Sequence, residues 1–321
     1  NGGWIREQSI PIFVGGAELN VAQALAKWEV PVAYLSALPA NLLSEQIVTY
    51  LSQKNVDCSV VQYRGNRIGT YYLPVGSELK NAGVIYDRAH SSFSELQPGM
   101  IDWNEVLKDV TWFHFSAICP AISQNVADVC EEALVAASAK GITISVDLNY
   151  RSKLWKYGMN SADVMPALTR YCNLVMGNVW AANTMLNVPM DHTLPQQDNK
   201  NAYLEQSLRT SVYISEQYPS CKAVANTYRF DQGVSGIKYY TTLYDSGNLF
   251  VSEEYHTDRV VDKVGSGDCF MAGLIYGQYN KNSSQETLDF ATAAAYEKLF
   301  IMGDATDKSV EQVKAAIIKH G

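Results

Sequence analysis

A glycine-rich turn bearing two aspartates lies late in the sequence, directly before an apolar stretch. It reads Asp262-Lys263-Val264-Gly265-Ser266-Gly267-Asp268. Glycine lets backbone N–H groups approach an anion closely, and a helix start adds unpaired N–H groups and a favourable dipole. The N–H groups of Gly265, Ser266 and Gly267 could therefore hold a phosphoryl group in transfer, and Asp268 could accept the proton of an attacking hydroxyl.

A simpler role also fits this aspartate, because Asp is a favoured residue at the start of a helix. For an isolated GxGD motif, helix capping is the commoner explanation. The chemistry therefore depends on what other residues the fold brings to the same place.

A second candidate segment lies near the beginning of the chain. Gly15 and Gly16 would let the start of a helix approach a ligand, and Asn20 offers two donors and an acceptor. Taken alone, the segment also fits a plain strand-to-helix turn.

Strand-like and helix-like segments alternate along most of the chain and must position these motifs. Strands are expected over 32–38, 112–116, 142–147, 174–177 and 223–225, with another ending near Val261, and helices over 45–54 and 124–140. Such alternation predicts an α/β fold, a mainly parallel central sheet flanked by helices on both faces.

Two extended segments without a helix between them interrupt this alternation. Residues 67–75 and 82–88 read as strands joined by a turn, and residues 5–14 also look extended. They predict a small antiparallel β lid of residues 1–14 and 67–88 on an α/β domain of residues 15–66 and 89–321. A structural hairpin or a dimer contact is the alternative.

Composition excludes several classes of protein. The net charge of −8 argues against a nucleic-acid-binding surface, and no apolar run approaches the roughly 18 residues of a membrane span. The six cysteines form no CxxC pair, and His114 lies in an apolar segment without metal-ligand spacing. These features predict a cytoplasmic protein with reduced cysteines. The start at Asn1, in mid-pattern, suggests that natural N-terminal residues are missing.

The two motifs, in this order, resemble those of the ribokinase-like (PfkB) family of carbohydrate kinases. The late turn resembles the family's C-terminal motif, with Ser266 in place of a smaller residue, and Gly15, Gly16 and Asn20 match the segment that contacts substrate hydroxyls. The resemblance covers nearly the whole chain except the family's first strand. It implies an ATP- and Mg²⁺-dependent kinase with Asp268 as base, and a monovalent cation such as K⁺ near the Asp262 loop.

Local segments are most similar to those of 2-keto-3-deoxygluconate kinases. They are 67–72, 85–89, 114–118 and 147–155. The resemblance implies a kinase that phosphorylates the terminal hydroxyl of a sugar acid. It also implies that the acid is bound by Tyr71, Tyr86, Arg88, Ile118 and Arg151. Independently, a residue after a buried strand lies where α/β proteins bind ligands, and arginine can grip a carboxylate through two hydrogen bonds. Lid packing for the tyrosines and ordinary ion pairs for the arginines are the alternatives.

One departure from the family pattern affects the nucleotide side. Asn178 matches the first residue of the family's N-x-x-E motif, but Ala181 stands in place of the glutamate. Magnesium could still bind through water and phosphates, and its protein ligands are left open. Gly303 and Asp304 match a family loop close to the nucleotide.

Three functions remain to be compared. The first is the sugar-acid kinase, the second a fructokinase-, ribokinase- or nucleoside-kinase-like enzyme for a neutral acceptor, and the third a pseudokinase that binds a sugar acid or nucleotide without turnover. Pairing of two lids in a homodimer is expected from the resemblance alone.

Overall fold

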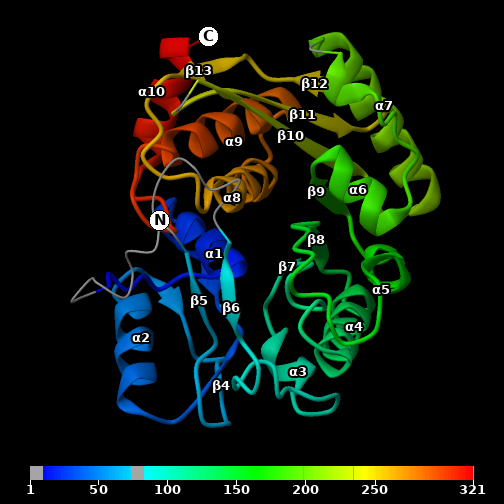
Figure 1. Cartoon of the computed structure of the whole chain (residues 1–321). Coiled ribbons are helices and arrows are strands. Elements are labelled where there is room, and N and C mark those ends of the chain that lie inside the picture. The colour runs from blue at the N-terminus through cyan, green and yellow to red at the C-terminus, as the bar shows by residue number, and fades with distance from the viewer. Residues whose placement is uncertain (1–9, 74–82, 198, 234, 321) are drawn as a thin grey trace.

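The computed structural model describes residues 10–73, 83–197, 199–233 and 235–320 (Figure 1). The helices are α1 (Ala17–Lys27), α2 (Leu42–Ser52), α3 (Trp103–Val106), α4 (Gln124–Ala139), α5 (Ser161–Thr169), α6 (Val179–Leu186), α7 (Lys200–Gln217), α8 (Ser266–Tyr279), α9 (Ser284–Lys298) and α10 (Val310–His320), with a 3₁₀ turn at Leu194–Gln196. The strands are β1 (Val32–Ala33), β2 (Ala37–Leu38), β3 (Val56–Asp57), β4 (Gln62–Tyr63), β5 (Thr70–Tyr72), β6 (Ile85–Asp87), β7 (Trp112–Ser116), β8 (Thr143–Asp147), β9 (Leu174–Gly177), β10 (Ala223–Gln232), β11 (Gly236–Asp245), β12 (Asn248–Val251) and β13 (Tyr255–Thr257).

A seven-stranded sheet forms the centre of the molecule. Its strands run in the order β12-β11-β10-β9-β8-β7, and β13 also pairs with β11. The β7–β8, β8–β9 and β9–β10 pairs are parallel, whereas β11 pairs antiparallel with β10, β12 and β13. The predicted α/β fold is confirmed. The antiparallel half was not predicted. The strand expected at 223–225 continues to Gln232 and pairs along its whole length with β11.

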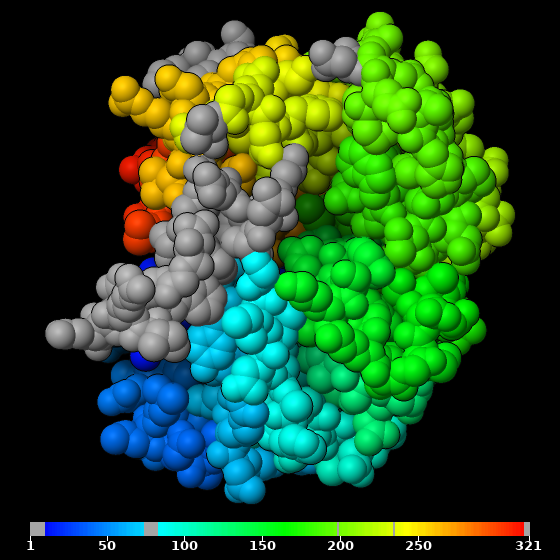
Figure 2. Space-filling model, in the orientation of Figure 1, coloured from blue at the N-terminus to red at the C-terminus, as the bar shows by residue number. Residues whose placement is uncertain are grey.

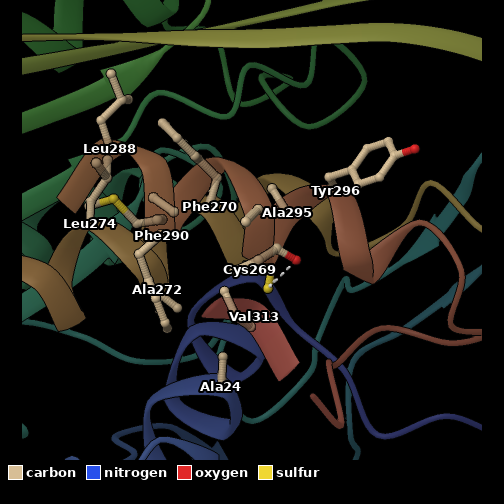
Figure 3. Close-up of a cluster of buried hydrophobic side chains, with 14 of the residues drawn as sticks. Ala24, Cys269, Phe270, Ala272, Leu274, Leu288, Phe290, Ala295, Tyr296 and Val313 are labelled. Atoms are coloured by element: carbon tan, nitrogen blue, oxygen red, sulfur yellow. Dashed lines mark hydrogen bonds between the residues drawn. The ribbon is translucent and has the colours of Figure 1, made fainter. Parts of the chain in front are cut away.

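Helices cover both faces of this sheet because successive strand residues point to opposite sides. Leu174 and Met176 of β9 pack into one apolar cluster with α1, α8, α9 and α10, whereas Val175 packs into another with α4, α5, α6 and α7. Figure 1 shows α8 and α9 beneath the long antiparallel strands. Figure 3 shows the first cluster, where Phe270 and Leu274 of α8 lie beside Leu288 and Phe290 of α9.

The segment predicted as one strand over 32–38 is two short strands. β1 pairs parallel with β3, and β2 pairs parallel with β4. Between the two pairs, the Tyr34 N–H donates to the Asp57 carbonyl beside β3, and the Ser36 carbonyl accepts from the Gln62 N–H of β4. Neither pair joins the central sheet.

The two predicted lid strands form an antiparallel pair, β5 with β6. Tyr71 lies opposite Tyr86, and Thr70 opposite Asp87. The predictions for 67–75, 82–88 and 5–14 extend in part to residues 74–82 and 1–9, which lie outside the described residues. Among the described residues 10–14 there is no strand. The division into an α/β domain and a lid stays a prediction.

The strand expected to end near Val261 ends earlier, at Thr257 in β13. The following segment is irregular because its backbone bonds to loops and not to a strand. Val260 donates to the Ser235 carbonyl, and the N–H groups of Val261 and Asp262 both donate to the Leu299 carbonyl. Two loops, 259–265 and 299–304, are thereby joined just before α8.

A cavity of about 640 Å³ lies between β7 and the segment 30–35. β7 ends the central sheet, and within the described residues it pairs only with β8, as β1 pairs only with β3. The walls are mainly apolar side chains of α1, α4, α8 and the two facing segments. No helix in the described part of the chain is long and apolar enough to cross a membrane.

Candidate functional site

A cleft of about 650 Å³ opens where β8 and β9 end, next to the first turn of α8. The carboxyl ends of parallel strands are the usual ligand-binding edge of an α/β sheet. In Figure 2 the surface is hollowed where the cyan segment containing β6 meets the green segments. The predicted site residues that line the cleft are Gly16, Asn20, Tyr71, Tyr86, Arg88, Ile118, Arg151, Asn178, Gly265, Ser266, Gly267, Asp268 and Asp304.

The first turn of α8 is shaped by Gly265, its N-cap. This glycine has φ of +73°, and a Cβ there would collide with the Asp304 carbonyl oxygen. The first helical bond runs from the Cys269 N–H to the Gly265 carbonyl at 2.8 Å. The preceding N–H groups of the helix start therefore face the cleft as a site for an anion.

Asp268 lies in this first turn and is buried, with 9% of its surface exposed. Burial raises its pKa to about 7, with smaller increases from the charges of Asp147 and Glu18. Its Oδ2 accepts a hydrogen bond of 2.7 Å from Asn20 Nδ2, which lowers the pKa in part. A carboxyl group with a pKa near neutrality is suited to proton transfer at physiological pH.

The N-terminal glycine motif brings Asn20 to this carboxylate. Gly16 is the N-cap of α1, and Asn20 donates one turn further along that helix. Gly15 does not line the cleft: its backbone lies against the side chain of Asp304, leaving no room for a Cβ. Gly15 therefore packs against Asp304, and its contact with substrate stays a prediction.

The lid pair closes one side of the cleft with aromatic rings and a cation. The Arg88 guanidinium lies 5.7 Å from the ring centroid of Tyr71 and 5.3 Å from that of Tyr86. Tyr71 also donates its hydroxyl hydrogen to the Asp304 carboxylate. These contacts hold Arg88 over the cleft and connect the lid to the C-terminal loop.

Arg151 follows β8 on another wall. Its side chain is exposed, and Nη1 donates to the Tyr150 carbonyl at 3.0 Å, so it forms no ion pair with Asp147 among the described residues. Asp147 is buried, and burial raises its pKa to about 6 although the Arg151 charge opposes the shift. An arginine with free donors at a cleft wall can bind a carboxylate.

The sequence analysis gave no site role to two cationic residues that line the cleft, Arg229 on β10 and Lys263. Arg229 donates through Nη1 to Ser266 Oγ at 3.4 Å. Its neighbour along the cleft wall, Lys263, pairs with Asp231 at 3.1 Å. The signal that could have found Arg229 is the continued alternation of apolar residues beyond Ala225.

Of the residues predicted to lie near the nucleotide, Asn178 and Asp304 line the cleft and Gly303 does not. Asn178 is the N-cap of α6, and its Oδ1 accepts from the Ala181 N–H at 2.8 Å; both residues line the cleft. Gly303 is not among the residues that line the cleft, and its N–H donates to Asp262 Oδ2 at 3.0 Å; its place near the nucleotide stays a prediction. Asp304 does line it, and burial raises the pKa of its carboxyl.

No group of three or more His, Cys, Asp or Glu side chains among the described residues is arranged to hold a metal ion. The few carboxylates of the cleft, such as Asp268, fit an Mg²⁺ ion that would be held mainly by phosphates and water, with one or two carboxylates nearby. They do not provide a closed metal cage.

The fold and cleft are those of an enzyme that transfers a phosphoryl group. The chain matches the description "pfkB family carbohydrate kinase" over residues 3–309, and it belongs to that family. This confirms the family resemblance seen in the two glycine motifs.

Three known proteins are similar over almost the whole chain. A 2-dehydro-3-deoxygluconokinase structure from Thermotoga maritima is 31% identical, with a TM-score of 0.88, covering 98% of this chain and 93% of that one. A 2-dehydro-3-deoxygalactonokinase from Haloferax volcanii is 27% identical over 95% of this chain and 89% of the relative. A putative ribokinase II from E. coli, in complex with ATP and Mg²⁺, shares the fold at 19% identity, with a TM-score of 0.73 and coverage of 98% and 92%.

Proposed function

We propose that this carbohydrate kinase is an ATP-dependent sugar-acid kinase that phosphorylates the terminal hydroxyl of 2-keto-3-deoxygluconate. The observation that carries the proposal is the position of Asp268. Its carboxyl, with a pKa raised by burial, stands in the anion-binding first turn of α8 and in the same cleft as Arg88 and Arg151.

In this proposal Asp268 accepts the proton of the attacking hydroxyl. Asn20 orients the carboxylate through its Nδ2, while its buried Oδ1 has no hydrogen-bond partner among the described residues and is free to accept from a substrate hydroxyl. The N–H groups of Ser266 and Gly267 hold the phosphoryl oxygens. Mg²⁺ bound to the nucleotide would neutralise phosphate charge.

The acid group of the substrate is assigned to the arginines. Arg88 is held over the cleft by two tyrosine rings, and Arg151, on another wall, uses only Nη1 in hydrogen bonds among the described residues. Arg229 and Lys263 lie beside the anion-binding turn, so Arg88 and Arg151 are the cations left for the acceptor, and they favour an anionic acceptor over fructose or ribose. The names of the relatives from T. maritima and H. volcanii also end in gluconokinase and galactonokinase, both kinases of sugar acids.

The galacto epimer, 2-keto-3-deoxygalactonate, is the second candidate. It is favoured by the H. volcanii relative, which covers 95% of this chain and carries that substrate in its name. The two acids differ at one hydroxyl stereocentre, so their acid groups and terminal hydroxyls could bind in the same way.

Two further features belong to the proposal. The β5–β6 pair acts as a lid whose closure excludes water from the transferring group. The predicted homodimer would form through that lid, and its test is the molar mass of the protein in solution by light scattering.

The test is a phosphoryl-acceptor screen with ATP and Mg²⁺ that follows ADP release. The two keto-deoxy sugar acids are compared with fructose and ribose, and the phosphorylated carbon is located by NMR. We expect efficient turnover of an acid at its terminal hydroxyl and little of either neutral sugar. Equal kcat/KM for the neutral sugars would refute the acid assignment, and binding of the acid without ADP release would favour a pseudokinase.

The matched variants are Arg151→Ala and Arg170→Ala. Arg170 lies outside the cleft and pairs with Glu131 on the surface at 2.7 Å. Loss of a charge-assisted hydrogen bond of about 1.5–3 kcal/mol should raise KM for the acid roughly ten- to hundredfold in Arg151→Ala. The Arg170 variant should retain the normal KM, and an Arg151 variant that does the same contradicts the binding role.

A further inference from the structure

Lys298 is a buried cation behind the anion-binding turn. It is the last residue of α9, and its side chain is inaccessible to solvent, with 0% of its surface exposed. Its Nζ donates to the Ile301 carbonyl at 2.9 Å. No carboxylate of the described residues pairs with it at ion-pair distance, in contrast to Lys263, which is paired with Asp231. A buried ammonium without a close anion needs another source of stabilisation.

Its surroundings are the two loops that support the start of α8. The Leu299 carbonyl accepts from Val261 and Asp262, and the Asp262 carboxylate accepts from the N–H groups of Val264 and Gly303. Because the Asp304 carbonyl lies against Gly265, the loop that follows Lys298 forms the rear wall of the anion-binding turn.

Three buried carboxyl groups lie in these loops or directly after them. Asp262, Asp268 and Asp304 have exposures of 6%, 9% and 8%. Burial lowers the pKa of Lys298, and the charges of all three aspartates oppose that shift. In return, the charge of Lys298 lowers the pKa of Asp304. The ammonium is therefore the counter-charge for a group of acids that stands beside a binding site for a polyanion.

We propose that the ammonium of Lys298 is a built-in monovalent cation that holds loops 259–265 and 299–304 together and makes the protein independent of added K⁺. A free K⁺ ion near the Asp262 loop, as expected from sequence, does not fit beside it. The Ile301 carbonyl is already engaged by the ammonium, and a second cation would be repelled at short range. Lys298 is thus a positioning residue that acts through the backbone of the anion-binding turn.

The experiment compares wild type with Lys298→Ala in chloride salts of K⁺, NH₄⁺ and choline at equal ionic strength. Melting temperature and the Kd for ADP are measured first, since neither requires turnover. Wild type should give the same values in all three salts. In Lys298→Ala, ADP binding should weaken about tenfold or more in choline and recover in K⁺ or NH₄⁺, because the deleted side chain leaves space for a free cation.

Two control variants make the comparison specific. Lys298→Met fills the space with an uncharged chain, so it should bind ADP weakly in every salt. Lys308→Ala removes a lysine paired with Glu297 at 3.2 Å, and should behave like wild type.

Three results would overturn the proposal: tighter ADP binding by wild type in K⁺ than in choline, unaltered binding by Lys298→Ala, or a loss in that variant that no cation repairs. The wild-type comparison decides the question even where the alanine variant does not fold. The kinetic consequence, a KM for ATP that follows the same salts, rests on the proposed kinase function. Failure of that function would abolish turnover in all salts while leaving the ADP-binding results intact.

Discussion

Replacing Asp268 by asparagine is expected to lower turnover sharply and to make the folded protein more stable above neutral pH. The two side chains have nearly the same shape, and an asparagine oxygen can still accept the 2.7 Å hydrogen bond from Asn20. What changes is the charge. The carboxylate must ionise in a buried position next to Asp147 and Glu18, whereas the amide stays neutral.

The magnitude follows from the pKa of about 7, compared with an ordinary value of 3.8. The folded protein keeps a proton that the unfolded chain releases, so stability falls as the pH rises from about 4 to 7 and then levels off. At 1.36 kcal/mol per pKa unit, the wild type loses about 4 kcal/mol across that window. Asp268→Asn is spared this loss, so its advantage is small at pH 4 and greatest at pH 8.

Urea unfolding of both proteins at pH 5 and pH 8 measures the effect. The stability advantage of the variant should be about 2–3 kcal/mol larger at pH 8, with equal urea m-values. Asp258→Asn, which replaces an exposed carboxyl, should show no such pH-dependent gain. An advantage of Asp268→Asn that is absent, or the same at both pH values, would refute the buried-base reasoning. Turnover should fall by about 10²–10⁴, the usual contribution of a general base.

Three further predictions concern the same turn and its partner Asn20. Gly265→Ala should cost at least about 2 kcal/mol in urea unfolding, because alanine resists a φ of +73° and its Cβ would collide with the Asp304 carbonyl; unchanged stability would mean that the turn relaxes freely. The kcat of wild type should rise with pH around an apparent pKa of about 7, as Asp268 ionises. In the wild type the hydrogen bond from Asn20 lowers the pKa of Asp268, so in Asn20→Ala, which lacks this bond, the inflection should move to higher pH. An inflection that does not move would contradict the contact between the two residues.

The parts of the site that the sequence predicts are those fixed by local backbone chemistry. Gly265 at the start of α8 needs left-handed backbone, and β8 ends at Asp147 as its apolar pattern indicates. Each of these two features is determined by the types of a few residues that are adjacent in the sequence. That Asn20 and Asp268 share one site is implied by the family resemblance and not by local pattern, and their hydrogen bond across 248 residues is seen only in the structure.

The residues that the sequence does not reveal depend on tertiary packing. Lys298 ends a helix, where a lysine ordinarily extends into solvent beside the helix dipole, and only the fold shows that it is buried. Arg229 escaped notice because the predicted strand stopped at Ala225, before the antiparallel pairing with β11 extends it. Gly303 matches a nucleotide loop in sequence, and only the structure shows that its N–H donates to Asp262.

The 640 Å³ cavity between β7 and residues 30–35 marks a seam at which the molecule should open locally. Segments that share no backbone hydrogen bonds separate at a lower free energy than strands paired within one sheet. The segments on either side are joined to their own partners, β8 and β3, but not to each other. The backbone amides along this seam should therefore exchange their hydrogens with solvent sooner than those of α8 and α9, which pack into the largest apolar cluster.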